Sequence, residues 1–450
     1  MKSRFILPIS FFYLLALSAV SIEAKQIPLE KLICYGEGSS VSISPDGKFY
    51  ASMVPSGEVS CDITDPEEDL AVPVLVVINL ETMEPKLYSG TQINNRVTSA
   101  TFLNNEQLLI RRSCQVGAGD QFNADCYSLY VLDVTTGKRE LILAAKQTSR
   151  GQGARIPQLF DVMPQYPNKV LVTINRMPQF TYRYRDLYWL DLETKETTKI
   201  AEVPTIDNEQ FSGWMVDHEG NARGFSTSHD AGRDRKPNSA KDGLYTYFYM
   251  MDSKTGNYKR MQSCKHQEPC LYPLDFDLDN RHVFAVGQAV LADGTLDPDW
   301  EYTDTNALWL YDSETGKVVE KVFHDKKYDF SNPRQGYSDG YVLIDRVNKK
   351  LLGLSYYADK RKYVYYDQGY ANLRESVKAT FPEKIVSIVP NSDLTKVIIN
   401  TSSEKDPGTG YFYDVSKGKI EFIASYAPWL QDYDLGSTYP FEFTARDGVE

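Results

Sequence analysis

Histidine is scarce in this chain of 450 residues, which contains five histidines but 31 tyrosines. Imidazoles are frequent metal ligands, so their scarcity argues against an enzyme with a metal centre. Basic residues are also in the minority, with 49 Lys and Arg against 61 Asp and Glu and a formal net charge of −12. Nucleic acids and anionic membranes are bound through a basic field, so neither is expected as a partner.

Long apolar runs are missing after residue 22, so no later segment is expected to cross a membrane. At the N-terminus, Lys2 and Arg4 precede eighteen uncharged residues, Phe5–Ile22. A short basic segment followed by a short apolar run predicts a secretory signal peptide over residues 1–24, cleaved after Ser21 or Ala24. The alternative is an uncleaved anchor, because eighteen residues is near the lower limit for a span. The predicted location is the periplasm or the medium.

The six cysteines include no Cys-x-x-Cys pair, and only Cys264-Lys265-His266 brings two possible zinc ligands together. An exported chain with an even number of cysteines is expected to form disulfides, and six cysteines allow 15 pairings. The simplest pairing joins sequence neighbours: Cys34 with Cys61, Cys114 with Cys126, and Cys264 with Cys270. We therefore predict structural disulfides and no metal site.

A repeated turn predicts the architecture. The clearest copies are Leu129–Lys138 and Leu308–Lys317, each an apolar run followed by an Asp-x-x-Thr-Gly-Lys turn and a second apolar run. This pattern indicates a β-hairpin with glycine at a position of positive φ. Seven copies follow one another at intervals of 47 to 61 residues, centred on Asn79, Asp133, Asp191, Asp252, Asp312, Asp367 and Asp414.

A second hairpin precedes most copies, as in Val41–Ala51, where apolar and polar residues alternate around Asp46-Gly47. Comparable turns are at Leu103–Glu106, Asp217–Gly220, Asp277–Asn280, Arg346–Lys349 and Pro390–Asp393. Two hairpins give four strands per unit, which predicts an all-β fold, a seven-bladed β-propeller over residues 25–440, with eight blades also possible. Only Ala371–Thr380 is expected to be helical, and the polar segments Pro55–Leu70, Gln147–Ala154 and Ser226–Asp242 are expected to be loops.

One motif matches a catalytic signature. Gly336–Gly340 has the Gly-x-Ser-x-Gly pattern of a nucleophile elbow, which requires a strand before it, a helix after it, and Asp and His later in the chain. The preceding residues are polar, Tyr341–Ile344 favours a strand, and all five histidines precede Ser338. We interpret the motif as a turn and Ser338 as non-catalytic.

The remaining candidates have plainer interpretations. Asp275–Asn280 begins like a calcium loop but has Asn280 and Val286 where an EF-hand needs Gly and Glu, so a hairpin is predicted. Asp65–Asp69 can hold a cation or an amine, although a solvated acidic loop is the simpler interpretation. Arg233–Lys241 lacks the interleaved aromatics of a nucleic-acid groove. His218 and His229 have no nucleophile or ligand at meaningful spacing. No catalytic, cofactor-binding or metal-binding residue is predicted, and no cofactor.

The last third of the chain carries a family resemblance. It contains, in order, Tyr357–Asp367, Leu373–Phe381, Val386–Asp393, Asp406–Asp414, Ala427–Leu430 and Phe443–Glu450. This series resembles the end of the propeller in the prolyl oligopeptidase family, in its dipeptidyl/acylaminoacyl-peptidase branch. Trp214–Arg223 is similar to a blade hairpin of the same branch.

The resemblance implies that residues 441–450 form the first strand of an α/β-hydrolase domain that continues beyond Glu450. That domain carries the Ser-Asp-His triad, so this chain has no positions onto which the triad can be placed. Some members hold the substrate ammonium with acidic propeller residues. Glu67-Glu68 is a pair of the right type, but its surroundings do not match.

Two functions are expected from the sequence. The first is the substrate-gating propeller of an exported serine peptidase that acts on short peptides, inactive without its catalytic domain. The second is a stand-alone periplasmic propeller that binds or scaffolds other molecules. A propeller enzyme with a channel-bound metal or quinone is a weaker third possibility.

Overall fold

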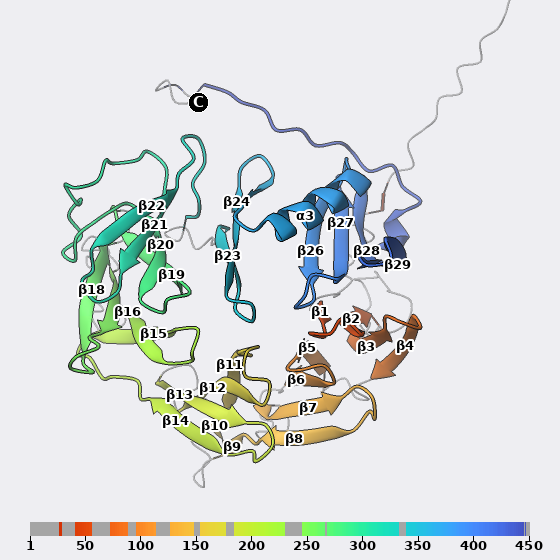
Figure 1. Cartoon of the computed structure of the whole chain (residues 1–450), viewed down its shortest axis with the longest axis horizontal. Helices are drawn as coiled ribbons and strands as arrows, with labels where there is room; N and C mark the ends of the chain where they lie inside the picture. Colours follow the sequence, from red (N-terminus) through yellow and green to blue (C-terminus); the bar gives the residue numbers. More distant parts are fainter. Residues whose placement is uncertain are drawn as a thin grey trace, which may run out of the picture.

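The structure, a computed structural model, describes residues 27–28, 41–55, 73–88, 96–113, 127–147, 154–176, 184–229, 245–265, 268–332, 339–444 and 446. The described strands form seven antiparallel blades arranged in a ring, in chain order, with the first blade beside the last (Figure 1), and one separate two-stranded ribbon. The predicted all-β, seven-bladed propeller is confirmed. None of the helices in the described part of the chain is long and apolar enough to span a membrane.

The blades are built from the following strands. Blade one holds β1 (Ser42–Ile43), β2 (Phe49–Pro55), β3 (Pro73–Asn79) and β4 (Glu84–Tyr88), and blade two holds β5 (Arg96–Phe102), β6 (Gln107–Ser113), β7 (Leu129–Asp133) and β8 (Arg139–Leu143). Blade three holds β11 (Pro157–Asp161), β12 (Lys169–Asn175), β13 (Arg185–Asp191) and β14 (Thr197–Ala201), and blade four holds β15 (Glu209–Val216), β16 (Ala222–His229), β17 (Tyr245–Met251) and β18 (Tyr258–Lys265). Blade five holds β19 (Leu271–Phe276), β20 (His282–Gly287), β21 (Ala307–Asp312) and β22 (Val318–Phe323). Blade six holds β23 (Tyr341–Asp345), β24 (Lys350–Tyr357) and β25 (Arg361–Tyr365), and blade seven holds β26 (Ile385–Pro390), β27 (Lys396–Ser403), β28 (Asp406–Asp414) and β29 (Lys419–Ser425).

The repeated Asp explains the turn between the third and fourth strands. In blade two the Asp133 carboxylate accepts hydrogen bonds from the backbone N–H groups of Thr135 (3.0 Å) and Thr136 (2.8 Å). The N–H of Gly137, at φ +75°, donates to the Asp133 carbonyl (2.8 Å). An Asp that satisfies its own turn in this way fixes the hairpin locally. Asp191, Asp252 and Asp312 make the same pair of bonds.

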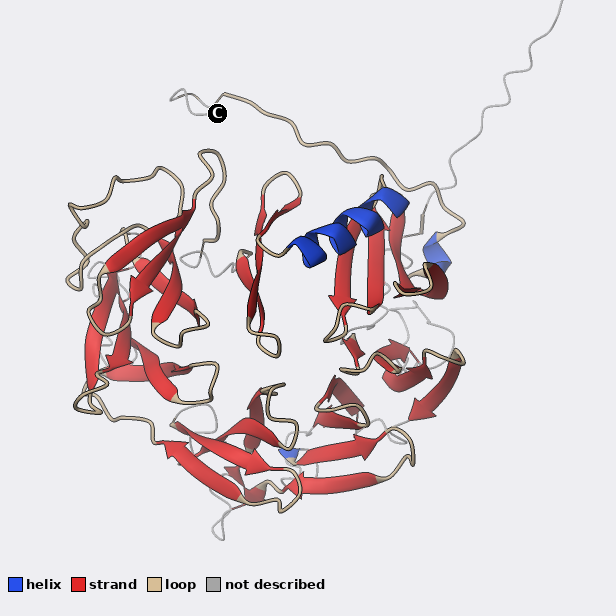
Figure 2. Ribbon diagram, viewed as in Figure 1, coloured by secondary structure: helices blue, strands red, loops and turns tan. Residues whose placement is uncertain are grey.

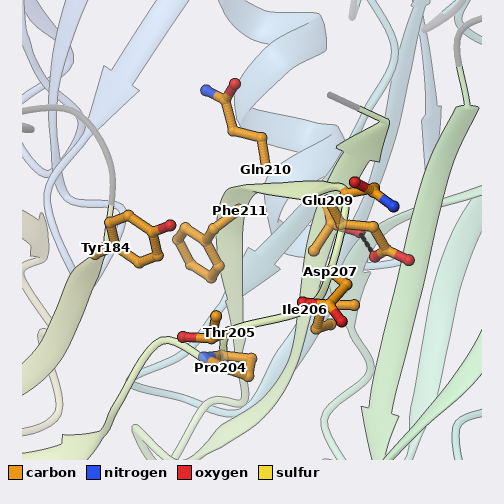
Figure 3. A pocket seen from close by; sticks show the side chains of 10 residues that line it. Tyr184, Pro204, Thr205, Ile206, Asp207, Glu209, Gln210 and Phe211 are labelled. Carbon is orange, nitrogen blue, oxygen red and sulfur yellow. Dashed lines mark hydrogen bonds between the residues drawn. The ribbon is translucent and has the colours of Figure 1, made fainter. Parts of the chain in front are cut away.

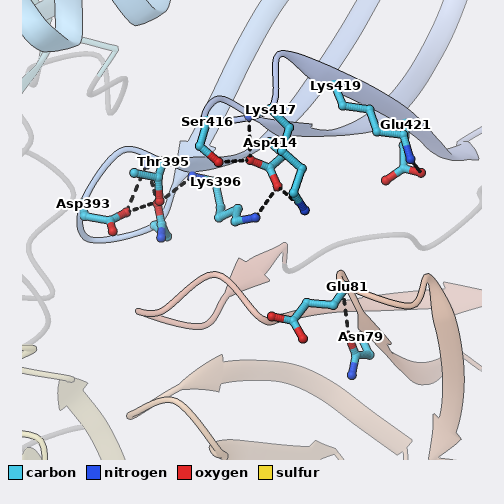
Figure 4. Close-up of polar contacts among 11 residues, drawn as sticks. Asn79, Glu81, Asp393, Thr395, Lys396, Asp414, Ser416, Lys417, Lys419 and Glu421 are labelled. Carbon is cyan, nitrogen blue, oxygen red and sulfur yellow. Dashed lines mark hydrogen bonds and ion pairs between the residues drawn. The ribbon is translucent and has the colours of Figure 1, made fainter.

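In blade seven the Asp at the equivalent turn position, Asp414, also pairs with two lysine side chains. The Asp414 side chain is 4% exposed and accepts hydrogen bonds from the Ser416 hydroxyl (2.7 Å) and the Lys417 N–H (3.2 Å). Its carboxylate also pairs with the ammonium groups of Lys396 and Lys417 (Figure 4). Burial alone would raise the pKa of Asp414, but the hydrogen bonds from Lys396, Ser416 and Lys417 outweigh burial and hold the pKa far below its usual range.

Blade six departs from the predicted four strands. Its repeat copy at Asp367 is not a hairpin turn, because Asp367 instead caps α3 (Gln368–Thr380) and accepts a hydrogen bond from the Tyr370 N–H (2.8 Å). The predicted helix at Ala371–Thr380 is confirmed, starting three residues earlier. This helix (blue in Figure 2) joins blades six and seven. The Arg374 guanidinium lies 3.7 Å from the Tyr363 ring centroid, while Leu373 packs on the face of blade seven.

Apolar faces between neighbouring blades form the core. Trp309 and Tyr311 of blade five are fully buried in the cluster shared with blade four. Ring closure has its own group, which we call the closure cluster: Ile43, Tyr50 and Leu80 of blade one against Ile398 and Phe412 of blade seven. Since each described blade consists of consecutive strands, this apolar contact joins the two ends of the ring, with no strand exchanged between them among the described residues.

The strand positions test several of the local predictions. The first-hairpin turns are confirmed at all six predicted positions, because each lies between the first two strands of a blade. The loop prediction for Ser226–Asp242 is wrong at its start, since Ser226–His229 completes β16, and Gln147 and Ala154 pair in a short ribbon, β9 (Lys146–Gln147) with β10 (Ala154–Arg155). Phe441–Thr444 pairs with no strand among the described residues, and the first strand of a further domain at residues 441–450 stays a prediction.

The predicted disulfide between Cys264 and Cys270 is confirmed, with Cα atoms 5.4 Å apart. It closes the short connection from β18 to β19, between blades four and five. Cys34, Cys61, Cys114, Cys126 and the predicted signal peptide lie outside the described residues.

Candidate functional site

The structure describes only some of the residues singled out in the sequence. Ser338 lies outside the described residues, as do Asp65–Asp69 with Glu67-Glu68, the Arg233–Lys241 segment and His266. The residues after the Gly-x-Ser-x-Gly motif form strand β23 rather than the helix that a nucleophile elbow requires. Asp277–Asn280 forms the turn between β19 and β20, so the hairpin interpretation of the calcium-like segment is confirmed.

Neither His324 nor His282 is placed to activate a nucleophile. Nε2 of His324 lies 3.0 Å from Oγ1 of Thr305, but that hydroxyl donates its proton to the Asp325 carbonyl. The hydroxyl therefore accepts from His324 and is not deprotonated by it. Nδ1 of His282 pairs with the Asp279 carboxylate (2.5 Å) on the surface of a turn.

His218 is buried at the turn after β15. Its Nε2 lies 2.8 Å from the Phe276 carbonyl of blade five, so this nitrogen carries the proton and donates it. Its Nδ1 is buried, with no partner among the described residues. No group of three or more His, Cys, Asp and Glu side chains in the described part of the chain is arranged to hold a metal ion.

A polar cavity of about 370 Å³ lies between blades three and four. Its lining comes from Tyr184, before β13, from the connection 204–208, and from the start of β15. Tyr184 and Phe211 lie side by side at one end, and Glu209 lies at the other end (Figure 3). The cavity thus has an aromatic wall facing a carboxylate.

The Glu209 cluster, which comprises Glu209, Thr227, Tyr247, Tyr249 and Arg260, fixes that carboxylate. The Glu209 side chain is 7% exposed and accepts hydrogen bonds from the Thr227 hydroxyl (2.5 Å), the Tyr249 hydroxyl (2.9 Å) and Nη2 of Arg260 (2.5 Å). The Arg260 guanidinium lies 4.1 Å from the Tyr247 ring centroid and also donates to the Tyr249 hydroxyl (2.7 Å). Every strand of blade four contributes one or more members of this cluster.

The electrostatics of the cluster match this geometry. Burial raises the pKa of Tyr249, and the hydrogen bond to Glu209 adds to this, while Arg260 opposes it. Burial would lower the pKa of Arg260, but its hydrogen bond and charge contacts with Tyr249 and Glu209 raise it overall. Both groups therefore keep their protons at neutral pH, and Glu209 has an acceptor role. This arrangement can hold a ligand against an aromatic wall, but it supplies no nucleophile.

Sequence reasoning missed the Glu209 cluster. The available signal was the alternation of Tyr245, Tyr247 and Tyr249, which places three tyrosines on one face of a strand. Register with β18 then brings Arg260 opposite Tyr249. Only the pairing of strands shows that Glu209 is the shared acceptor.

No family model matches the chain, and no protein with a curated description matches it. Among solved structures, it is similar to the β-propeller domain of the trilobed protease from Pyrococcus furiosus, with 12% identity over 87% of this chain and 97% of that chain and a TM-score of 0.41. It is also similar to the Pyrococcus horikoshii acylaminoacyl peptidase, with 13% identity, 90% of this chain, 55% of that chain and a TM-score of 0.42. A prolyl endopeptidase matches with 11% identity, 93% of this chain, 54% of that chain and a TM-score of 0.47.

These structure neighbours are propeller domains of prolyl oligopeptidase-family peptidases, and propellers of TolB proteins match as well, with TM-scores of 0.29 and 0.28. The chain spans about half the length of the acylaminoacyl peptidase and of the prolyl endopeptidase. At these identities the likeness concerns the propeller fold, and it assigns no activity to this chain.

Proposed function

We propose that this chain is the propeller portion of an exported serine peptidase of the prolyl oligopeptidase family that acts on short peptides. The observation that carries the proposal is the segment after blade seven, where the family-like series of the sequence ends. In that segment Tyr439, Phe441 and Phe443 are 76%, 83% and 69% exposed. Neighbouring exposed aromatic side chains are characteristic of a surface that another element covers.

In the complete enzyme the hydrolase domain would supply the Ser-Asp-His triad and carry out acyl transfer through serine. The propeller would restrict entry to short, unfolded peptides and help to position them. The cavity beside Glu209, with its aromatic wall and fixed carboxylate, is a suitable place for such a peptide to contact the ring. The chain alone is expected to be inactive.

The coding sequence beyond codon 450 tests the proposal most directly. We expect an open frame that encodes Gly-x-Ser-x-Gly, then Asp and then His. A stop codon at this position in several strains would instead support a stand-alone propeller, the second candidate. That candidate is favoured by one observation, namely that each described blade is built from its own consecutive strands and the closure cluster joins the ring ends.

A peptidase assay on residues 25–450 is the second test. We expect no turnover of fluorogenic dipeptides, because no triad is available. Turnover that disappears in the Ser338→Ala variant would contradict both the turn interpretation and the gating role.

Export is part of the proposal. N-terminal sequencing of the protein recovered from a periplasmic fraction is expected to begin at Ile22 or Lys25, after cleavage at Ser21 or Ala24. Recovery of the intact N-terminus in the membrane fraction would favour the uncleaved anchor.

A further inference from the structure

Several of the turns between the first and second strands of neighbouring blades are hydrogen-bonded to one another. Ser392 N–H donates to the Pro45 carbonyl (3.2 Å), which joins blade seven to blade one. Asn105 accepts from the Asp46 N–H (3.1 Å), which joins blades one and two, and Asn280 accepts from the His218 N–H (2.9 Å), which joins blades four and five. We call the side of the ring that carries these turns the turn face.

Blade six contributes a different contact. Its turn donates from Asn348 to the Ser392 carbonyl of the neighbouring blade seven (3.0 Å). Arg346, at the start of the same turn, does not pair with a neighbour. Its Nη1 lies 2.5 Å from Oδ2 of Asp161, the last residue of the innermost strand of blade three.

This ion pair crosses the ring. Blades three and six are three places apart among seven, and Figure 1 shows the β23–β24 hairpin pointing to the middle of the ring, opposite β11. Asp161 is oriented for the contact, because its other oxygen accepts a hydrogen bond from the Met163 N–H (3.1 Å). The Arg346 turn is therefore held from two sides, by a neighbouring blade and by a distant one.

A third carboxyl group, from another blade, interacts electrostatically with both members of the pair. Asp275, on the innermost strand of blade five, is in the electrostatic field of Arg346, His218 and Asp161. Burial raises the pKa of Asp275, Arg346 and His218 oppose this, and Asp161 adds to it. Arg346 is thus the one arginine of this group, set among two carboxyl groups and an imidazole that come from three other blades.

We propose that Arg346 and Asp161 form an ionic latch that holds the blade-six hairpin across the ring axis at the turn face. While the latch is closed, an extended chain cannot pass along the axis through this face. The Glu209 cluster lies at the other end of β15 from His218, roughly 25 Å away for an eight-residue strand. A ligand of the ring would then approach from the face that carries Glu209. This inference does not depend on the peptidase assignment.

The Arg346–Asp161 ion pair is expected to break readily. Both side chains are 26% exposed, and ion pairs in contact with solvent are weak and screened by salt. Asn348 keeps the turn attached to blade seven when the pair breaks. Opening therefore involves the turn Arg346–Lys349, while Val342 and Leu354 of the same hairpin stay packed in the apolar core between blades five and six.

Hydrogen exchange of the full chain tests the latch with charge reversals. In Arg346→Glu and in Asp161→Lys, backbone amides of Arg346–Lys349 are expected to exchange about three- to tenfold faster than in the wild type. The double variant restores opposite charges and is expected to return within about twofold of the wild type. Lys195→Glu is the matched control, because Lys195 pairs at 2.5 Å with Glu140 between adjacent blades at the rim.

Each result of the exchange experiment either supports or overturns the latch. Unchanged exchange in the single variants, or a double variant as fast as the single ones, would overturn the latch. Exchange in β21 at the wild-type rate shows that the variants are folded. If either single variant fails to fold, raising NaCl from about 0.05 to 1 M on the wild type takes its place. Salt must then speed exchange in the Arg346–Lys349 turn more than in β21, and equal effects would overturn the proposal.

Discussion

The Glu209 cluster and the Arg346 latch are both groups of charged side chains. The members of the first come from one blade, whereas those of the second come from blades on opposite sides of the ring. Glu209 meets donors from the three other strands of its own blade, and its side chain is 7% exposed. Arg346 meets Asp161 from across the ring, and both side chains are about a quarter exposed. The cluster within one blade is satisfied and rigid, whereas the contact between blades is open to water.

The two kinds of contact are expected to affect different properties of the protein. Burying a carboxylate requires several donors at once, and consecutive strands of one sheet can supply them in a fixed register. A contact across the ring depends on the position of every blade between its partners, so tight burial there would couple the whole ring to one pair. We expect loss of the first kind of contact to lower global stability, and loss of the second kind to change local motion.

The largest effect is expected for Glu209→Ala. This change leaves Arg260, Tyr249 and Thr227 without their shared acceptor, and breaking a buried pair is costly. Because Arg260 is 43% exposed and can regain water, we expect the free energy of unfolding to fall by about 2 kcal/mol, measured by urea denaturation. The control is Glu202→Ala, whose side chain is 54% exposed in its pair with Arg176. Equal losses in the two variants would remove the contrast.

Asp414→Asn is expected to cost about 2 kcal/mol at pH 7, because a buried carboxylate with charged donors is replaced by an amide. The pKa of Asp414 is lowered in the folded state, so its stabilisation is fully present above the unfolded value near 4. It is lost as the pH falls below that value. Urea titrations at pH 7 and pH 3 should therefore show a smaller difference between variant and wild type at pH 3.

Asp275→Asn is expected to have the opposite sign. Burial raises the pKa of Asp275, so its ionisation above pH 4 is unfavourable to the folded state despite Arg346 and His218. Removing the charge should raise the free energy of unfolding at pH 7 and change it little at pH 3. A loss of stability at pH 7 would show that the Asp275 carboxylate stabilises the fold through Arg346. Arg346, Asp161 and Asp275 would then resemble the Glu209 cluster.

The smallest global effect is expected for Arg346→Gln. A pair this exposed contributes at most about 1 kcal/mol, so the urea midpoint should shift little while exchange in the hairpin increases. A loss comparable to that of Glu209→Ala would mean that the latch is part of the core.

The propeller could be predicted from the sequence because the turns between its strands are formed by local hydrogen bonds. Asp133 and its equivalents bond to N–H groups two and three residues ahead, so the signal for each hairpin is contained in a few residues. The same chemistry explains the error at Asp367. An Asp that accepts from an N–H three residues ahead also caps a helix, and the turn and the cap use the same residue type.

The contacts within the two charged groups are less accessible to sequence reasoning. The pairing of Glu209 with Arg260 depends on the register of four strands, although the alternating tyrosines of β17 point to that face. The pairing of Arg346 with Asp161 joins residues 185 positions apart and exists only once the ring has closed. No periodicity in the chain encodes such a distance.

The closure cluster has a consequence for how the protein folds. Contacts within a blade are local and form early, whereas Ile43 and Ile398 meet only after a very long loop has closed. Blades are therefore expected to form in order as the chain emerges, and ring closure is expected to come last. Until then, blade one and blade seven each present an apolar face made for the other. At high concentration these faces can meet between two molecules, so refolding should yield domain-swapped dimers in proportion to protein concentration.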